Sequence, residues 1–126
     1  MSDSSLSIGV SHAIDGFNLE LRQDIPLNGV TAIFGPSGSG KTSALNTIAG
    51  FLRPKSGTVR FGSTYWFSDA EKIWVPPHRR SIGTVFQDAQ LFPHLSVRGN
   101  LDFADRRSDK DKPGRRFEDI VSAMAL

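Results

Sequence analysis

The feature of the sequence that most constrains the fold is a glycine-rich stretch between an apolar run and a helical pattern. Residues 35–42, Gly-Pro-Ser-Gly-Ser-Gly-Lys-Thr, fit the phosphate-binding loop pattern G-x-x-x-x-G-K-[ST] at every fixed position. Residues 30–34 form a short apolar run, which predicts a strand buried on both faces. After the loop, a helical pattern continues until Gly50 and Pro54 end it. Its apolar positions are Ala44, Leu45, Ile48, Ala49 and Leu52.

The residue types of this loop suit the recognition of a polyphosphate. A triphosphate crowds several negative charges together, so its donors must be oriented before it arrives. The glycines permit positive φ, which lets successive backbone N–H groups converge on one anion. The helix N-terminus adds unpaired N–H groups and the positive end of the helix dipole. We therefore expect a nucleotide to contact Gly35, Pro36, Ser37, Gly38, Ser39, Gly40, Lys41, Thr42 and Ser43.

Two side chains of the loop have expected roles beyond general attraction. The Lys41 ammonium is expected to bridge the β- and γ-phosphates, which makes Lys41 a candidate catalytic residue. The Thr42 hydroxyl is expected to bind Mg²⁺. A nucleotide and Mg²⁺ are thus the expected ligands.

Length and composition exclude several classes of protein. The chain has 126 residues, which fits a single domain, and 38% of them are hydrophobic. No run approaches the roughly 18 apolar residues that a membrane-spanning helix needs. The N-terminus lacks the basic and apolar regions of a signal peptide, so the default compartment is the cytoplasm. The absence of cysteine excludes disulfides and thiolate metal sites.

The basic character of the chain is confined to one segment. The formal net charge is +2, and the stretch from Asp105 to Arg116 contains more basic than acidic residues. The rest of the chain has a slight excess of acidic residues. Because this stretch mixes both signs and contains Pro and Gly, it is predicted to be a solvated connector. We therefore expect no nucleic-acid partner.

Alternating apolar residues predict strands on both sides of the loop. Residues 5–11 and 17–22 alternate, which predicts a half-buried strand pair with a hairpin turn at Asp15-Gly16. Three further short strands are predicted, at residues 56–61, 64–67 and 82–86.

Two more helices are predicted in the second half of the chain. Ser96 can cap a helix that runs through Phe103 and Ala104. A last helix is predicted from the i, i+3, i+4, i+7 spacing of Phe117, Ile120, Val121 and Met124. Trp66 and Trp74 are expected to pack against the face of the sheet.

Several motifs besides the loop point to one family. Residues 56–59 read Ser-Gly-Thr-Val, and residues 77–87 read Pro-His-Arg-Arg-Ser-Ile-Gly-Thr-Val-Phe-Gln. Residues 91–97 read Leu-Phe-Pro-His-Leu-Ser-Val, and Asn100 follows. Together with the loop, these motifs resemble the ATP-binding subunits of ABC transporters. The resemblance runs from the first strand to about Phe103.

The residues of the later motifs are most similar to those of one group of importers. Residues 85–94, Val-Phe-Gln-Asp-Ala-Gln-Leu-Phe-Pro-His, are followed by Val-Arg-Gly-Asn-Leu at 97–101. These residues resemble the corresponding motifs in the importers of molybdate and related oxyanions. Sulfate, iron and sugar importers share most of these motifs.

The resemblance implies a fold and a division of the chain. The implied class is α/β, a P-loop NTPase core with an antiparallel β subdomain. Residues 1–95 would form the core, and residues 96–126 would begin a helical subdomain. The family's L-S-G-G-Q signature, Asp-Glu strand end and switch histidine do not occur in the sequence. The chain is therefore expected to be the first half of a catalytic domain, truncated before the signature motif and the second acidic strand, with slow hydrolysis.

The resemblance also assigns a role to Gln87. Its amide would contact ATP, Mg²⁺ and the attacking water, and it is a candidate catalytic, cofactor-binding and metal-binding residue. It follows the predicted strand at residues 82–86, and the carboxyl ends of parallel strands line the ligand crevice of such folds. An amide can bind Mg²⁺ without adding a competing negative charge.

Partners and location follow from the same resemblance. Residues 88–97 would form a mobile loop that contacts transmembrane permease subunits, with an apolar surface made by Leu91, Phe92 and Leu95. A second ATP-binding subunit would complete a homodimer. A periplasmic or extracellular solute-binding protein would take part indirectly. The protein would then be peripheral at the cytoplasmic face of the cell membrane.

The adenine-binding residue and the activity of the chain are left open by the sequence. The family stacks adenine on an aromatic residue near the end of the first strand, where this sequence offers His12 and Phe17. The alternation of Phe17 with Leu19 and Leu21 favours a place for it in the core. The alternatives to a transport ATPase are a small P-loop phosphotransferase and a nucleotide-binding fragment without turnover.

We expect the isolated 126-residue chain to be poorly soluble or marginally stable. A parallel sheet needs both faces covered, and each Val, Leu or Ile left in water forgoes about 1.5–3 kcal/mol. Thermal unfolding and solubility at neutral pH measure this. A sharp unfolding transition together with high solubility would contradict the expectation.

Overall fold

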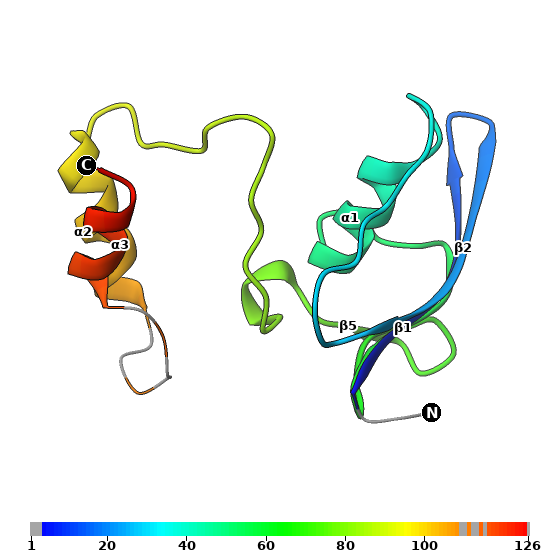
Figure 1. Ribbon diagram of the computed structural model, residues 1–126. Helices are drawn as coiled ribbons and strands as arrows, with labels where there is room; N and C mark the ends of the chain where they lie inside the picture. The colour runs from blue at the N-terminus through cyan, green and yellow to red at the C-terminus, as the bar shows by residue number, and fades with distance from the viewer. Residues whose placement is uncertain (1–3, 109–110, 112–113, 115, 126) are drawn as a thin grey trace. The chain divides into compact units, whose positions relative to one another are not determined.

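The computed structural model describes residues 4–108, 111, 114 and 116–125. The chain divides into two compact units, residues 1–84 and residues 85–126, and each is described by itself (Figure 1). The first unit contains an antiparallel sheet and the helix α1. The second contains the helices α2 and α3. The predicted division at residues 95 and 96 into a core and a helical subdomain stays a prediction.

The first unit is built on a five-stranded antiparallel sheet with the order β2-β1-β3-β4-β5. The first two strands pair along their whole length and are joined by Asp15 at φ 46° and Gly16 at φ 80°. Positive φ at both residues is the two-residue hairpin turn that follows the right-handed twist of the strands. The predicted hairpin is confirmed. The strands are β1 Ser5–Ile14, β2 Phe17–Pro26, β3 Ser56–Phe61, β4 Thr64–Ser68 and β5 Ile73–Trp74.

The core of this unit lies on one face of the sheet. Alternate residues of β1 are buried there, and they cluster with residues of β3 and β4. Trp66 stacks on Phe61 with ring centroids 4.6 Å apart, and Phe67 meets Trp74 edge to face at 6.1 Å. The expected packing of both tryptophans is confirmed. The buried core residues are Leu6, Ile8, Val10, Val59, Trp66 and Phe67.

Helix α1, Lys41–Ala49, packs on this unit through Ala44, Thr47 and Ala49. His12 lies on the buried face of β1, and its Nε2 is 2.8 Å from Thr47 Oγ1. The Thr47 hydroxyl donates its own proton to the Ser43 carbonyl at 2.7 Å, so it accepts from a protonated Nε2 of His12. A side-chain hydrogen bond therefore joins the sheet to the helix that follows the phosphate loop.

Two predicted strands are wrong. Residues 30–34 and 82–86 are neither helix nor strand, and Val30, Phe34 and Val85 are almost fully exposed. A strand buried on both faces needs hydrogen-bonded neighbours and covering layers. Among the described residues, the sheet pairs only β1 to β5, and neither segment has a neighbouring strand. An apolar run alone does not supply these partners.

The second unit contains the two helices that the sequence predicts. Helix α2, Val97–Arg107, begins after Ser96, whose hydroxyl accepts a hydrogen bond from the Gly99 N–H at 3.0 Å. Helix α3 is Phe117–Ala123. The start of the predicted charged connector is helical, because α2 runs to Arg107; its residues 109, 110, 112, 113 and 115 lie outside the described residues. No helix in the described part of the chain is both long and apolar enough to cross a membrane.

Two short elements were not predicted from the sequence. The strand β5 has only two residues, and the 3₁₀ helix η1 spans Pro77–Arg79. Elements of this length carry too few residues for a periodic pattern. They bring the chain from the sheet toward Arg80, which is buried.

We predict that acid destabilises the first unit through His12. Burial lowers the pKa of His12 from its ordinary value of 6.5, because a charged imidazole would lose its hydration. The unfolded chain therefore binds the proton more readily, so the stabilisation is complete above about pH 6.5 and is lost as the pH falls toward the folded-state pKa. Denaturant unfolding at about pH 7.5 and about pH 5.5 should show a smaller acid-induced loss for His12→Gln than for the wild type.

His78 supplies the control for this measurement, because it is exposed. His78→Gln should retain the pH dependence of the wild type. Equal pH dependence in His12→Gln and His78→Gln would contradict the assignment to His12.

Candidate functional site

The phosphate loop adopts a backbone that only glycine accommodates well. Gly38 has φ 79° and Gly40 has φ 94°, both in the left-handed region. Gly40 is the N-cap of α1, and its carbonyl accepts the first helical bond from the Ala44 N–H at 2.9 Å. A Cβ at Gly40 would lie 2.9 Å from Leu19 Cδ1. The glycine therefore allows both the turn of the chain and the close approach of β2.

The Lys41 ammonium is folded onto the loop. Its Nζ donates to the carbonyl of Gly35 at 2.5 Å and to that of Pro36 at 2.8 Å. These contacts hold the cation beside the loop rather than in bulk solvent. Since the helix N-terminus and the ammonium lie in one place, the site attracts anions through two independent sources of positive potential.

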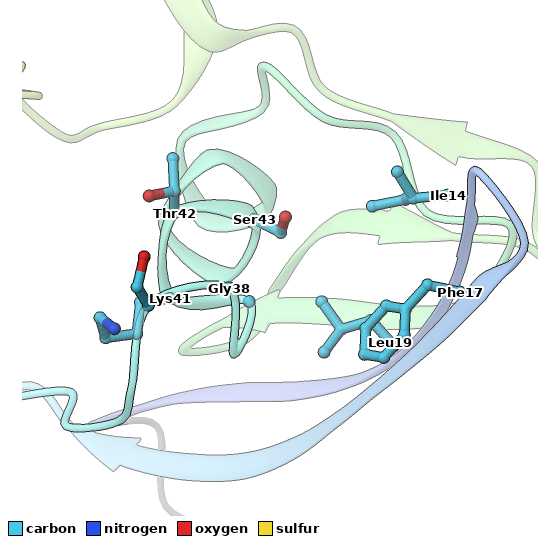
Figure 2. Close-up of a pocket in the computed structure, with 9 residues that line it drawn as sticks. Ile14, Phe17, Leu19, Gly38, Lys41, Thr42 and Ser43 are labelled. Atoms are coloured by element: carbon cyan, nitrogen blue, oxygen red, sulfur yellow. The ribbon is translucent and has the colours of Figure 1, made fainter.

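A pocket of about 320 Å³ joins the loop to the end of the hairpin. Figure 2 shows Lys41, Thr42 and Ser43 on the first turn of α1, with Ile14, Phe17 and Leu19 across the pocket on the strands. One wall is therefore polar and favours anions, and the other is apolar. Such a pocket suits a ligand with phosphates at one end and a flat apolar group at the other. It is lined by Ile14, Phe17, Leu19, Ser37, Gly38, Gly40, Lys41, Thr42 and Ser43.

The structure distinguishes the two aromatic candidates for base stacking. His12 is 2% exposed and is hydrogen-bonded to Thr47, so its ring has no open face. Phe17 is 55% exposed and lines the pocket. The expectation that Phe17 lies in the core is wrong, because β3 pairs with β1 only as far as Ser11. The hairpin projects beyond this point.

Gln87 and the segment after it belong to the second unit. Residues 85–92 contain neither helix nor strand, and Gln87 is exposed. The role expected for its amide stays a prediction.

Part of the predicted docking segment is held by Asn100. The Asn100 Oδ1 accepts from the Phe92 N–H at 2.8 Å, and its Nδ2 donates to the Ser96 carbonyl at 2.9 Å. The Phe92 ring also packs on Phe103, with centroids 4.6 Å apart. Exposed apolar side chains remain on this segment at Leu91 and Phe92.

The Thr42 hydroxyl is an oxygen donor of the kind that Mg²⁺ prefers. No group of three or more His, Cys, Asp or Glu side chains that could hold a metal lies within the described ranges. The hydroxyl of Thr42 is exposed beside Lys41, and Mg²⁺ prefers oxygen ligands shared between protein, water and phosphates. One protein hydroxyl therefore fits a metal that arrives with a polyphosphate.

Sequence reasoning missed two lining residues and one buried cation. The sequence places Leu19 in a predicted strand and Ile14 outside the predicted strands, and the projecting end of the hairpin brings both to the loop. Arg80 has no predicted role beyond its place in the motif at residues 77–87, but it is 4% exposed. The tryptophans near it in the sequence were the one available signal, since arginine stacks on aromatic rings.

Comparison with known proteins places the chain in a family. The family model described as ABC transporter matches residues 19–126. The molybdenum import ATP-binding protein ModC of Photobacterium profundum is 37% identical over 121 residues, which cover 96% of this chain and 33% of that protein. ModC of Thiobacillus denitrificans is 46% identical over 111 residues, 88% of this chain and 30% of that protein.

A third relative is more similar over a shorter stretch. ModC of Methylococcus capsulatus is 52% identical over 93 residues, which cover 74% of this chain and 26% of that protein. The chain thus spans about a third or less of the length of these relatives. Since the family model covers most of the chain, including the phosphate loop, the chain belongs to the ABC transporter family.

Proposed function

We propose that the chain is part of the ATP-binding subunit of an ABC importer that couples ATP hydrolysis to the uptake of molybdate or a related oxyanion. The observation that carries the proposal is the pocket in which Lys41 and the loop face the apolar end of the hairpin. Relatives named as molybdenum import ATP-binding proteins support the choice of solute. Family membership favours this function over a small phosphotransferase.

In the proposed complex, each part of the pocket binds a different part of ATP. The N–H groups at residues 38–43 and the Lys41 ammonium bind the phosphates, and Phe17 stacks on the adenine ring. The Thr42 hydroxyl helps to hold Mg²⁺, which when bound neutralises charge on the phosphates. The apolar wall excludes water from one side of the nucleotide, which strengthens the electrostatic attraction.

Hydrolysis is proposed for the whole protein. Gln87 would contribute its amide to the metal and to the attacking water. No acidic side chain lines the pocket, so the described residues bind and orient ATP without supplying a general base there. Turnover by these residues alone is therefore expected to be slow.

The proposed partners follow the family. Residues 88–97 would contact transmembrane permease subunits through the apolar surface of Leu91, Phe92 and Leu95, of which Leu91 and Phe92 are exposed. A second copy of the subunit would complete a homodimer, and a solute-binding protein would act indirectly through the permease. The subunit would be peripheral at the cytoplasmic face of the membrane.

Removing the loop ammonium tests nucleotide binding. Lys41→Ala should weaken the affinity for Mg²⁺-ATP by about 10-fold or more, because a hydrogen bond to a charged group contributes about 1.5–3 kcal/mol. Calorimetric titration of the full chain measures the dissociation constant. Lys55→Ala, a change of an exposed lysine outside the pocket, should retain the wild-type affinity. Absence of binding by the wild type would refute the proposed function.

The role of the apolar wall is tested by two ligands that differ in the base. Phe17→Ala should weaken ATP binding by about 10-fold, since stacking of a base on an aromatic ring contributes about 1–3 kcal/mol. The same change should leave the affinity for Mg²⁺-tripolyphosphate nearly unchanged. Leu45→Ala, at an exposed position of α1 outside the pocket, is the control. An equal loss for both ligands would show that Phe17 acts on the phosphate loop and not on the base.

A further inference from the structure

The guanidinium of Arg80 is buried at the end of α1 that lies opposite the phosphate loop. Its Nη1 donates to the carbonyls of Thr47 and Ile48 at 2.8 and 2.7 Å. Its Nε donates to the Val75 carbonyl at 2.9 Å. The last carbonyls of a helix lack partners within the helix. Arg80 supplies a donor to the Ile48 carbonyl and a second donor to the Thr47 carbonyl, which also accepts from the Gly50 N–H at 3.3 Å.

Two aromatic rings and one glycine complete this site. The Arg80 guanidinium carbon lies 5.4 Å from the ring centroid of Trp66 and 5.0 Å from that of Trp74. Gly50 ends the helix at φ 90°, and a Cβ there would lie 2.8 Å from Arg80 Nε. Glycine at position 50 therefore leaves room for the guanidinium where a side chain would collide with it.

The last turn of α1 is held from two sides. Arg80 binds the Thr47 carbonyl, and His12 of β1 binds the Thr47 hydroxyl. The helix has no basic residue of its own in its last turn, so Arg80 supplies the cation that the negative end of the helix dipole favours. Because α1 is a short hydrogen-bonded rod, fixing its last turn also restrains the direction of its first turn.

Stability alone does not account well for this arrangement. Burial disfavours the charged guanidinium and lowers the pKa of Arg80. Among the described residues, its Nη2 is buried and has no hydrogen-bond partner. A buried cation with one unpaired nitrogen is weak evidence for a purely stabilising role, since an apolar side chain could fill the same space.

We propose that Arg80 is a positioning residue that fixes α1 so that the amides of the phosphate loop and Lys41 converge on the nucleotide. The proposal rests on the proposed function, because the nucleotide is the ligand whose donors are positioned. It assigns to Arg80 an effect on the opposite end of the helix, at Gly40 and Lys41. When a group that acts on the ligand is displaced by about 1 Å, much of its effect on that ligand is lost.

The experiment compares Arg80→Gln and Arg80→Lys in the full chain with two controls. Arg79→Gln changes the exposed neighbouring cation, and Val59→Ala removes side-chain volume from the buried core of the sheet. Amide hydrogen exchange of residues 40–46 is measured without nucleotide. The affinity for Mg²⁺-ATP is measured by calorimetry at a temperature where each variant is folded.

Tryptophan fluorescence adds a local reporter. The chain contains two tryptophans, and both lie beside Arg80. Addition of Mg²⁺-ATP should change the fluorescence of the wild type and of Arg79→Gln, because the helix connects the nucleotide to the anchor. The change should be absent in Arg80→Gln.

The expected result separates positioning from stability. Arg80→Gln should speed amide exchange at residues 40–46 and weaken Mg²⁺-ATP binding by about 10-fold or more, because misplaced donors bind the phosphates less well. Arg80→Lys should lie between Arg80→Gln and the wild type, because it keeps the charge but not the paired geometry. Val59→Ala should lower the melting temperature without either change.

Two results would overturn the proposal. Unchanged exchange and affinity in Arg80→Gln, or equal changes in Val59→Ala, would reduce Arg80 to an ordinary core residue. If Arg80→Gln does not fold, Arg80→Lys decides the same comparison. If the wild type does not bind Mg²⁺-ATP, the proposed function fails, and the exchange comparison still decides whether Arg80 fixes the phosphate loop.

Discussion

The attachment of α1 to the antiparallel sheet is the constraint on which the rest of the first unit depends. A glycine-rich loop does not fix its own conformation, because glycine allows many backbone conformations and has no side chain to pack. The proposed convergence of its amides depends on the helix that follows, which is held by His12 from the strand β1 and by Arg80 beyond the helix C-terminus. Local chemistry supplies the donors, and packing on the sheet supplies their direction.

The attachment of α1 also decides which side chains lie beside the phosphate loop. The end of the hairpin extends past the pairing with β3, so the Phe17 ring is left open beside Gly40 and Lys41. An anion-binding surface and an apolar surface thus meet in one pocket. The close approach of Leu19 to Gly40 shows how little space separates them.

Much of the fold could be read from the sequence where a pattern is local. The turn at Asp15-Gly16, the cap at Ser96 and the helix after the loop each depend on residues within a few positions of one another. The runs at 30–34 and 82–86 were wrong as strands, because a buried strand is defined by neighbours that the run itself does not contain. The alternation of Phe17 with Leu19 and Leu21 likewise could not show which residues would cover it, so the expectation that Phe17 lies in the core was wrong.

The sequence by itself determined the phosphate loop, because glycine spacing and the lysine that follows are properties of adjacent residues. It also determined the hairpin and the helices, whose hydrogen bonds close over short distances along the chain. Only the tertiary structure decided that Phe17 faces the loop, that His12 is buried against Thr47, and that Arg80 binds the end of α1. These contacts join residues more than twenty positions apart, and such pairing is set by the sheet register and by packing.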